Sequence, residues 1–143
     1  MREIIEIAAL LIVGPMVGVE IAVAAFTNPV FSRLPDGAFT QARADGSRVL
    51  GRVMPFWYIA ALVLLVVAAV VTWSNWLITA SAALMAVVVL VTVTLMVPIN
   101  NRIGRWSDPA EADRDLARRW DRSHWLRVGL LIVLYGLLVI SVS

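Results

Sequence analysis

The sequence predicts an all-α fold: a four-helix transmembrane bundle with a cytoplasmic helical extension before the last span. The composition, four long apolar runs and the placement of the arginines predict it. Of the 143 residues, 61% are hydrophobic and 15% are charged, whereas soluble domains average about 45–50% apolar and about 25% charged residues. A soluble domain of this length could not bury so much apolar surface, so lipid must cover the rest of a single integral membrane domain.

Each of the four apolar runs is long enough to cross a bilayer, which takes about 20 residues in a helix. Helices are expected because an isolated strand cannot satisfy its backbone polar groups in lipid. The spans are predicted at about residues 4–26, 56–73, 76–97 and 125–142.

Local residues mark several ends of these spans. Pro55 precedes three aromatic residues and suits the start of the second helix. Ser74-Asn75 is flanked by tryptophans and predicts a tight hairpin at the membrane interface. Asn28-Pro29 and Pro98 are expected to end or kink the first and third helices, because proline removes a backbone donor.

A further helix is predicted in the loop before the last span. Asp108 suits an N-cap, Pro109 suits the first helical position, and Glu111 completes the capping pattern. Asp115 and Arg118 then stand at a helical pairing distance. We therefore expect a helix from about Pro109 that runs into the last span.

The arginines fix the expected orientation. The loop between the first two spans and the loop between the last two carry nearly all of them, and the other side of the membrane has only Arg2. Because positive residues stay inside, both long loops are predicted in the cytoplasm and both termini outside, in a multi-pass protein of the cell (inner) membrane. The loop arginines are Arg33, Arg43, Arg48, Arg52, Arg102, Arg105, Arg114, Arg118, Arg119 and Arg122.

Several kinds of chemistry are excluded by residue type. The chain has no cysteine and no lysine, which removes thiolate and Schiff-base chemistry, and no nucleic-acid-binding pattern is visible. Its one histidine, His124, falls short of the ligand sets of catalytic zinc and non-haem iron sites. No cofactor or metal is predicted. A haem held by a single histidine stays an open alternative that no residue pattern supports.

One carboxylate lies inside the first span. Glu20 is several residues from the cytoplasmic end, where a charge costs about 2.5–3.5 kcal/mol on insertion scales. Ala24 and Asn28 follow at four-residue steps and form one stripe with it. Such a residue faces the bundle and finds a partner, for a functional reason or for a purely structural one.

Arg127 is the partner that we expect for Glu20, because it lies beyond Trp125 in the last apolar run, at a matching depth. His124 shares its helix face, and Asn100 lies at the same end of the third span. Topology thus gathers five polar side chains near the cytoplasmic edge: Glu20, Asn28, Asn100, His124 and Arg127. Around one apolar cavity, they could bind and deprotonate a lipophilic aromatic or carbonyl compound.

Three segments resemble the anthrone oxygenase-like family of four-span membrane proteins, most of which have no known function. They are Glu20 with Asn28-Pro29, the run 97–103 (VPINNRI), and the run 119–127 (RWDRSHWLR). The resemblance implies oxidation of an anthrone or phenolic polyketide-type compound, with molecular oxygen as co-substrate and no cofactor. It also implies that His124 takes a proton from the substrate, while Asn28, Asn100 and Arg127 hold the oxyanion.

An alternative is a non-catalytic small subunit or stabiliser of a larger membrane complex. Glu20 and Arg127 would then be a structural pair, and Gly14 and Gly18 would form a helix interface with a membrane partner protein or a second copy of the chain. A carrier for protons or solutes fits poorly, because four spans without an internal repeat lack the usual transporter architecture.

Overall fold

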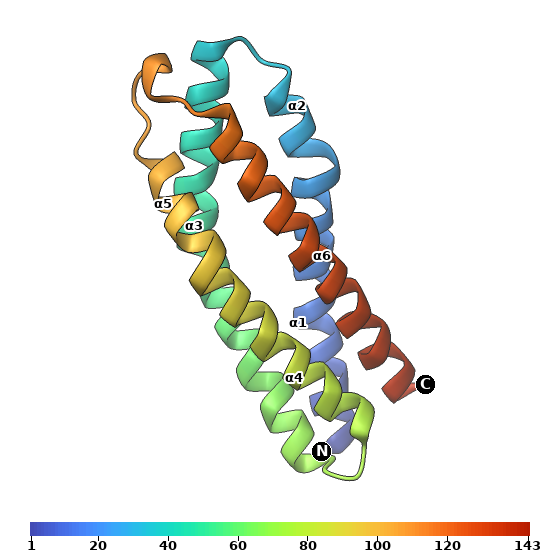
Figure 1. Ribbon diagram of the computed structural model, residues 1–143. Coiled ribbons are helices and arrows are strands. Elements are labelled where there is room, and N and C mark those ends of the chain that lie inside the picture. The colour runs from blue at the N-terminus through green and yellow to red at the C-terminus, as the bar shows by residue number, and fades with distance from the viewer.

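The computed structural model describes all residues, 1–143, and confirms the all-α bundle. The chain forms four long helical rods, which run antiparallel up and down the bundle (Figure 1). The first and third rods are each interrupted by a π-helical turn. In chain order the rods are α1 (Arg2–Ala22), η1 (Val23–Thr27) and α2 (Asn28–Ser32); α3 (Asp36–Val71); α4 (Trp76–Val91), η2 (Thr92–Met96) and α5 (Val97–Gly104); and, after a short 3-10 turn η3 (Pro109–Glu111), α6 (Arg114–Val142).

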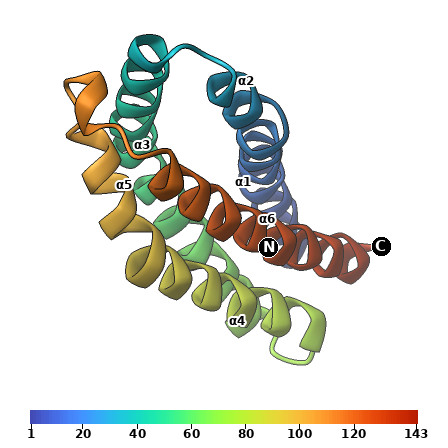
Figure 2. The ribbon, with the colours of Figure 1, turned by 45° about the horizontal axis from the view of Figure 1, so that its top comes forward.

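The two arginine-rich connections lie together at one end of the bundle (Figures 1 and 2). Both termini and the tight α3–α4 turn lie at the other end (Figure 1). In that turn Asn75 caps α4, since its side-chain oxygen accepts a hydrogen bond from the backbone of Leu77. The predicted hairpin is therefore present.

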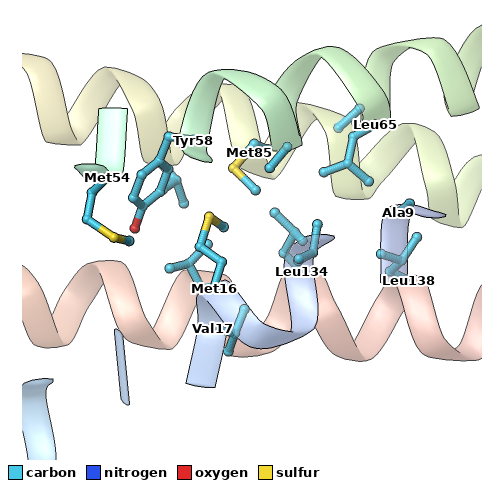
Figure 3. Close-up of a cluster of buried hydrophobic side chains, with 14 residues drawn as sticks. Ala9, Met16, Val17, Met54, Tyr58, Leu65, Met85, Leu134 and Leu138 are labelled. Atoms are coloured by element: carbon cyan, nitrogen blue, oxygen red, sulfur yellow. The ribbon is translucent and has the colours of Figure 1, made fainter. Parts of the chain in front are cut away.

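The interior of the bundle is packed with aliphatic and methionine side chains from all four rods. Figure 3 shows Tyr58 at one end of this cluster, beside Met54 and Met16. A second cluster, around Phe39 and Trp106, fills the arginine-rich end. The candidate site described below lies where α1, α3 and α6 pass from the first cluster towards the second.

The outward faces of the rods are also apolar, as lipid requires. Exposed large side chains such as Phe26, Phe56, Val63 and Leu90 are more than half accessible. Each rod contains a stretch long and apolar enough to cross a membrane. The chain is thus a multi-pass membrane protein with four spans.

The prediction that the second helix begins near Pro55 is wrong. The helix α3 begins at Asp36 and carries Pro55 in its interior. Proline has no N–H to give to the carbonyl of Gly51, but packing against neighbouring helices sustains such a defect in membrane proteins. Most of the first arginine-rich loop is therefore helical.

The first and third rods neither end nor break at their prolines. A π turn precedes each proline instead, and the backbone N–H groups of Asn28 and Val97 reach carbonyls five residues back, on Val23 and Thr92. Each rod then continues as an α-helix through Pro29 or Pro98. Such π turns are frequent at functional sites, and both lie beside the site described below.

The helix before the last span starts later than predicted. Asp108 caps only the 3-10 turn at Pro109–Glu111, by accepting from Ala110. The chain then extends, and Asp113 caps α6 by accepting from the backbone of two residues in its first turn. From Arg114 the helix runs without a break into the last span, so the helical extension itself is confirmed.

Candidate active site

Three predicted residues form one buried polar cluster between α1 and α6. Arg127 Nη2 donates to Glu20 Oε2 at 2.7 Å and to His124 Nδ1 at 3.1 Å. His124 Nε2 lies 3.0 Å from the backbone oxygen of Glu20. All three residues are at most 6% exposed. The predicted pairing of Glu20 with Arg127 is therefore present.

The hydrogen bonds assign the protons of His124. A guanidinium only donates, so Nδ1 accepts from Arg127, while Nε2 carries the hydrogen that goes to the carbonyl of Glu20. This pattern of hydrogen bonds requires a neutral imidazole that carries its hydrogen on Nε2. Its Nδ1 also lies 3.4 Å from Glu20 Oε2. Both ring nitrogens consequently face oxygens of Glu20.

Aromatic rings enclose this cluster. Trp120, one helical turn before His124, stacks on the imidazole with ring centroids 4.7 Å apart and planes inclined by 15°. The guanidinium of Arg127 lies 5.2 Å from the ring centre of Tyr58. Arg127 Nε and Tyr58 Oη are buried and have no hydrogen-bond partner. Buried polar atoms without a partner are rare in native structures and mark this cluster as unusual.

A mostly apolar cavity of about 270 Å³ lies beside the cluster, between α3 and the η2–α5 segment. Its wall includes Arg127, Tyr58 and Trp120 together with Thr92 and Asn100. Thr92 lies in the second π turn, and its Oγ1 accepts from Arg127 Nη1 at 3.3 Å. The cavity therefore presents a cation and amide and hydroxyl groups on an otherwise apolar surface. We call it the Arg127 cavity.

The five predicted side chains do not surround a single hollow. Arg127 and Asn100 line the Arg127 cavity, whereas His124 and Glu20 are behind Arg127 and belong to no wall of it. Asn28 lines a neighbouring cavity of about 230 Å³, which it shares with Asn100 and Trp120. Asn100 is itself fixed, because its Nδ2 donates to the carbonyl of Ser47 at 3.1 Å.

Sequence reasoning missed Arg43, which was counted only as a loop charge. Its side chain is 4% exposed and donates to Asn28 Oδ1, to the carbonyl of Ala117 and to Asp121 Oδ1, at 3.0, 3.3 and 2.9 Å. It also lies 5.6 Å from the ring centre of Trp120. Arg43 follows the buried Phe39 by four residues, so the two side chains lie on the same face of α3. This spacing would have predicted a buried Arg43 if the loop had been predicted as a helix.

Arg43, Trp120 and His124 therefore form a continuous stack that leads to Arg127. No group of three or more histidine, cysteine, aspartate and glutamate side chains comes together in the chain. The arrangement can hold an anionic oxygen at Arg127 and Asn100. It can also accept a proton at His124 once the hydrogen bond from Arg127 is given up.

Comparison with known proteins identifies a family. The model of a family described as anthrone oxygenase matches residues 47–137, more than half of the chain. The matched region contains Asn100, Trp120, His124 and Arg127, and stops short of Glu20 and Asn28. No curated protein and no solved structure matches the sequence.

Proposed function

The chain belongs to the anthrone oxygenase family, and on that premise we propose that it is a membrane-embedded enzyme that oxidises a lipophilic aromatic compound. The substrate is of the anthrone or phenolic polyketide type. Molecular oxygen is the co-substrate, and no cofactor takes part. The observation that carries this proposal is the placement of Arg127 on the wall of an apolar cavity at membrane depth.

The Arg127 cavity suits a flat, apolar compound with one oxygen substituent. Its wall includes aliphatic side chains such as Met54, Val89 and Val93, against which aromatic rings can pack. The substrate oxygen lies at the polar side of the cavity, which Arg127 and Asn100 line, and Asn100 is held in place by its bond to Ser47. Both groups stabilise the charge that develops on this oxygen.

The proposed reaction begins by breaking a C–H bond of the methylene carbon between the aromatic rings. The bonding electrons delocalise onto the carbonyl oxygen, which becomes the oxyanion held by Arg127. The electron-rich anion then reduces molecular oxygen. One oxygen atom forms the new carbonyl, and the other leaves as water with the two hydrogens of the methylene group. The products, a quinone and water, balance the equation.

His124 takes the proton in this scheme. The substrate oxygen competes with His124 Nδ1 for Arg127 Nη2, and movement of the guanidinium towards the substrate frees that nitrogen. Because His124 does not line the Arg127 cavity, this movement must also open the path by which the proton reaches Nδ1. Protonated on Nδ1, the ring faces the carboxylate of Glu20 at 3.4 Å and its carbonyl at 3.0 Å. Glu20 therefore stabilises the imidazolium, and Asn28 supports the site through Arg43.

The cavity is proposed to lie on the cytoplasmic side of the inner membrane. The support is the positive-inside rule, since both arginine-rich connections flank this end of the bundle. A lipophilic substrate would then reach the site from the inner leaflet.

The test is oxidation of an anthrone by purified protein in detergent under air, followed by quinone absorbance and oxygen consumption. The wild type should form quinone faster than detergent alone, and His124→Ala should fall to that background. Gly18→Leu is the control, because Gly18 is exposed and a Cβ atom added there meets nothing within 4 Å. A folded wild type without activity, always purified with the same second protein, would support the subunit alternative instead.

A further inference from the structure

A polar cleft of about 470 Å³ lies between α3 and α5 at the arginine-rich end. None of its lining residues is hydrophobic, which sets it apart from the Arg127 cavity. We call it the arginine cleft. It is lined by Ser47, Arg48, Gly51, Arg52, Asn100, Asn101, Gly104 and Arg105.

The cleft carries three positive charges and no carboxylate in its wall. Arg48 Nε donates to the carbonyl of Gly104 at 2.9 Å, and its Nη1 meets only the half-exposed Asp45 outside the cleft. Arg105 Nε donates to the carbonyl of Asn101 at 3.2 Å, and the side chain of Arg52 makes no hydrogen bond or ion pair. Most of the guanidinium N–H groups therefore remain free. An anion between them would relieve their mutual repulsion.

The cleft lies at headgroup depth. Arg52 precedes Phe56, the first exposed aromatic residue of the apolar part of α3, by one helical turn. Aromatic residues mark the level where a membrane meets water. Basic pockets between transmembrane helices at this level bind the phosphates of lipid headgroups.

We propose that the arginine cleft binds a phosphate group, carried by an acidic phospholipid or by a free phosphate compound. Planar guanidinium groups recognise phosphate through paired N–H donors, and Asn101 adds an amide at the same wall. The cleft shares Gly51, Asn100 and Asn101 with the Arg127 cavity. A bound phosphate would thus border the proposed substrate site, although the inference does not depend on the oxidation chemistry.

The experiment compares two triple variants of equal charge change. Arg48→Gln/Arg52→Gln/Arg105→Gln empties the cleft of charge. Arg118→Gln/Arg119→Gln/Arg122→Gln removes three exposed arginines of α6 that lie outside it. Native mass spectrometry counts phosphatidylglycerol and phosphatidylcholine bound to each protein released from mixed-lipid nanodiscs. Calorimetric titration with inorganic phosphate in neutral detergent forms the second arm.

The wild type and the α6 variant should retain the anionic ligand, and the cleft variant should bind it roughly 100-fold more weakly, at about fivefold for each arginine lost. Arg52→Gln alone should lose about fivefold, and it leaves folding intact because Arg52 is exposed and unpaired. Retention of phosphatidylglycerol would identify the lipid as the source, and binding of inorganic phosphate alone would identify a free compound. Equal losses in both triple variants, or no binding by the wild type in either arm, would overturn the proposal.

Discussion

Arg127 donates to the carboxylate of Glu20 at 2.7 Å, with the two side chains only 7% and 3% exposed. The bond joins the first span to the last, and Glu20 lies three residues before the first π turn. It also holds the guanidinium against His124 and on the wall of the Arg127 cavity. The same contact therefore stabilises the bundle and positions the proposed site.

Removal of either partner should destabilise the protein strongly, because the other charge is left buried. Glu20→Leu and Arg127→Leu should each lower the free energy of unfolding by about 3–5 kcal/mol. The double variant Glu20→Leu/Arg127→Leu should recover much of this loss, since no lone charge remains. Unfolding of the purified protein with sodium dodecyl sulfate measures all three, and additive losses in the double variant would show that the two side chains do not interact.

Arg43→Gln should weaken the arginine-rich end of the bundle. The variant loses the bonds to Asp121 and Asn28, and hydrogen bonds of charged groups contribute about 1.5–3 kcal/mol each in favourable cases. Arg118→Gln is the matched control, because its ion pair with Asp115 is on the surface and such pairs contribute about 0–1 kcal/mol. Thermal unfolding of the two variants in one detergent compares them. A melting temperature as high for Arg43→Gln as for the control would contradict the buried role.

Gly51→Ala should disturb Asn100 and with it the Arg127 cavity. A side-chain carbon at position 51 would lie 3.0 Å from Asn100 Nδ2, closer than such atoms normally approach. At Gly46 on the same helix, the nearest atom is 3.7 Å away, on Phe31. Alanine favours helix by about 1 kcal/mol over glycine, so Gly46→Ala should be neutral or stabilising. Binding of an anthraquinone, measured by fluorescence quenching, should weaken only in Gly51→Ala, and equal binding by both variants would contradict the close contact.

The membrane orientation can be tested with single cysteines, because the chain has none of its own. Ser107→Cys places a thiol in the α5–α6 connection, and Ser74→Cys places one in the α3–α4 turn; both positions are exposed. In intact cells, a membrane-impermeant maleimide should label Ser74→Cys and leave Ser107→Cys unlabelled until the cells are lysed. The reverse pattern would place the arginine-rich end outside.

The fold was predictable because the lengths of the apolar runs and the positions of the arginines are properties of whole segments. The residues at which the helices begin and end were not predictable in this way. Residues 27–55 were predicted as a loop because Pro55 was expected to start the second helix. In the structure Pro55 lies inside α3, where packing against neighbouring helices compensates for its missing hydrogen bond. The π turns before Pro29 and Pro98 likewise depend on packing between helices, which one sequence does not display.

The part of the candidate site that depends only on depth in the membrane was predictable from the sequence. Glu20, His124 and Arg127 lie at one level of a bundle and carry groups that seek partners, so their meeting follows from topology. The enclosure of His124 by Trp120 depends on side-chain rotamers, and the separation of Asn28 from the Arg127 cavity depends on the course of α3. Arg43 was missed because its segment was predicted as a loop and not as part of a helix.

The most direct test of the proposed oxidation is the fate of heavy-isotope-labelled molecular oxygen during turnover of an anthrone by the protein in lipid vesicles. Mass spectrometry should find one labelled oxygen atom in each quinone formed, at a rate above that of empty vesicles. Arg127→Met should lower this rate to the vesicle background, whereas Arg118→Met, on the surface of the same helix, should leave it unchanged. Quinone formation at the background rate by the wild type, or equal rates in the two variants, would contradict an oxidation site at Arg127.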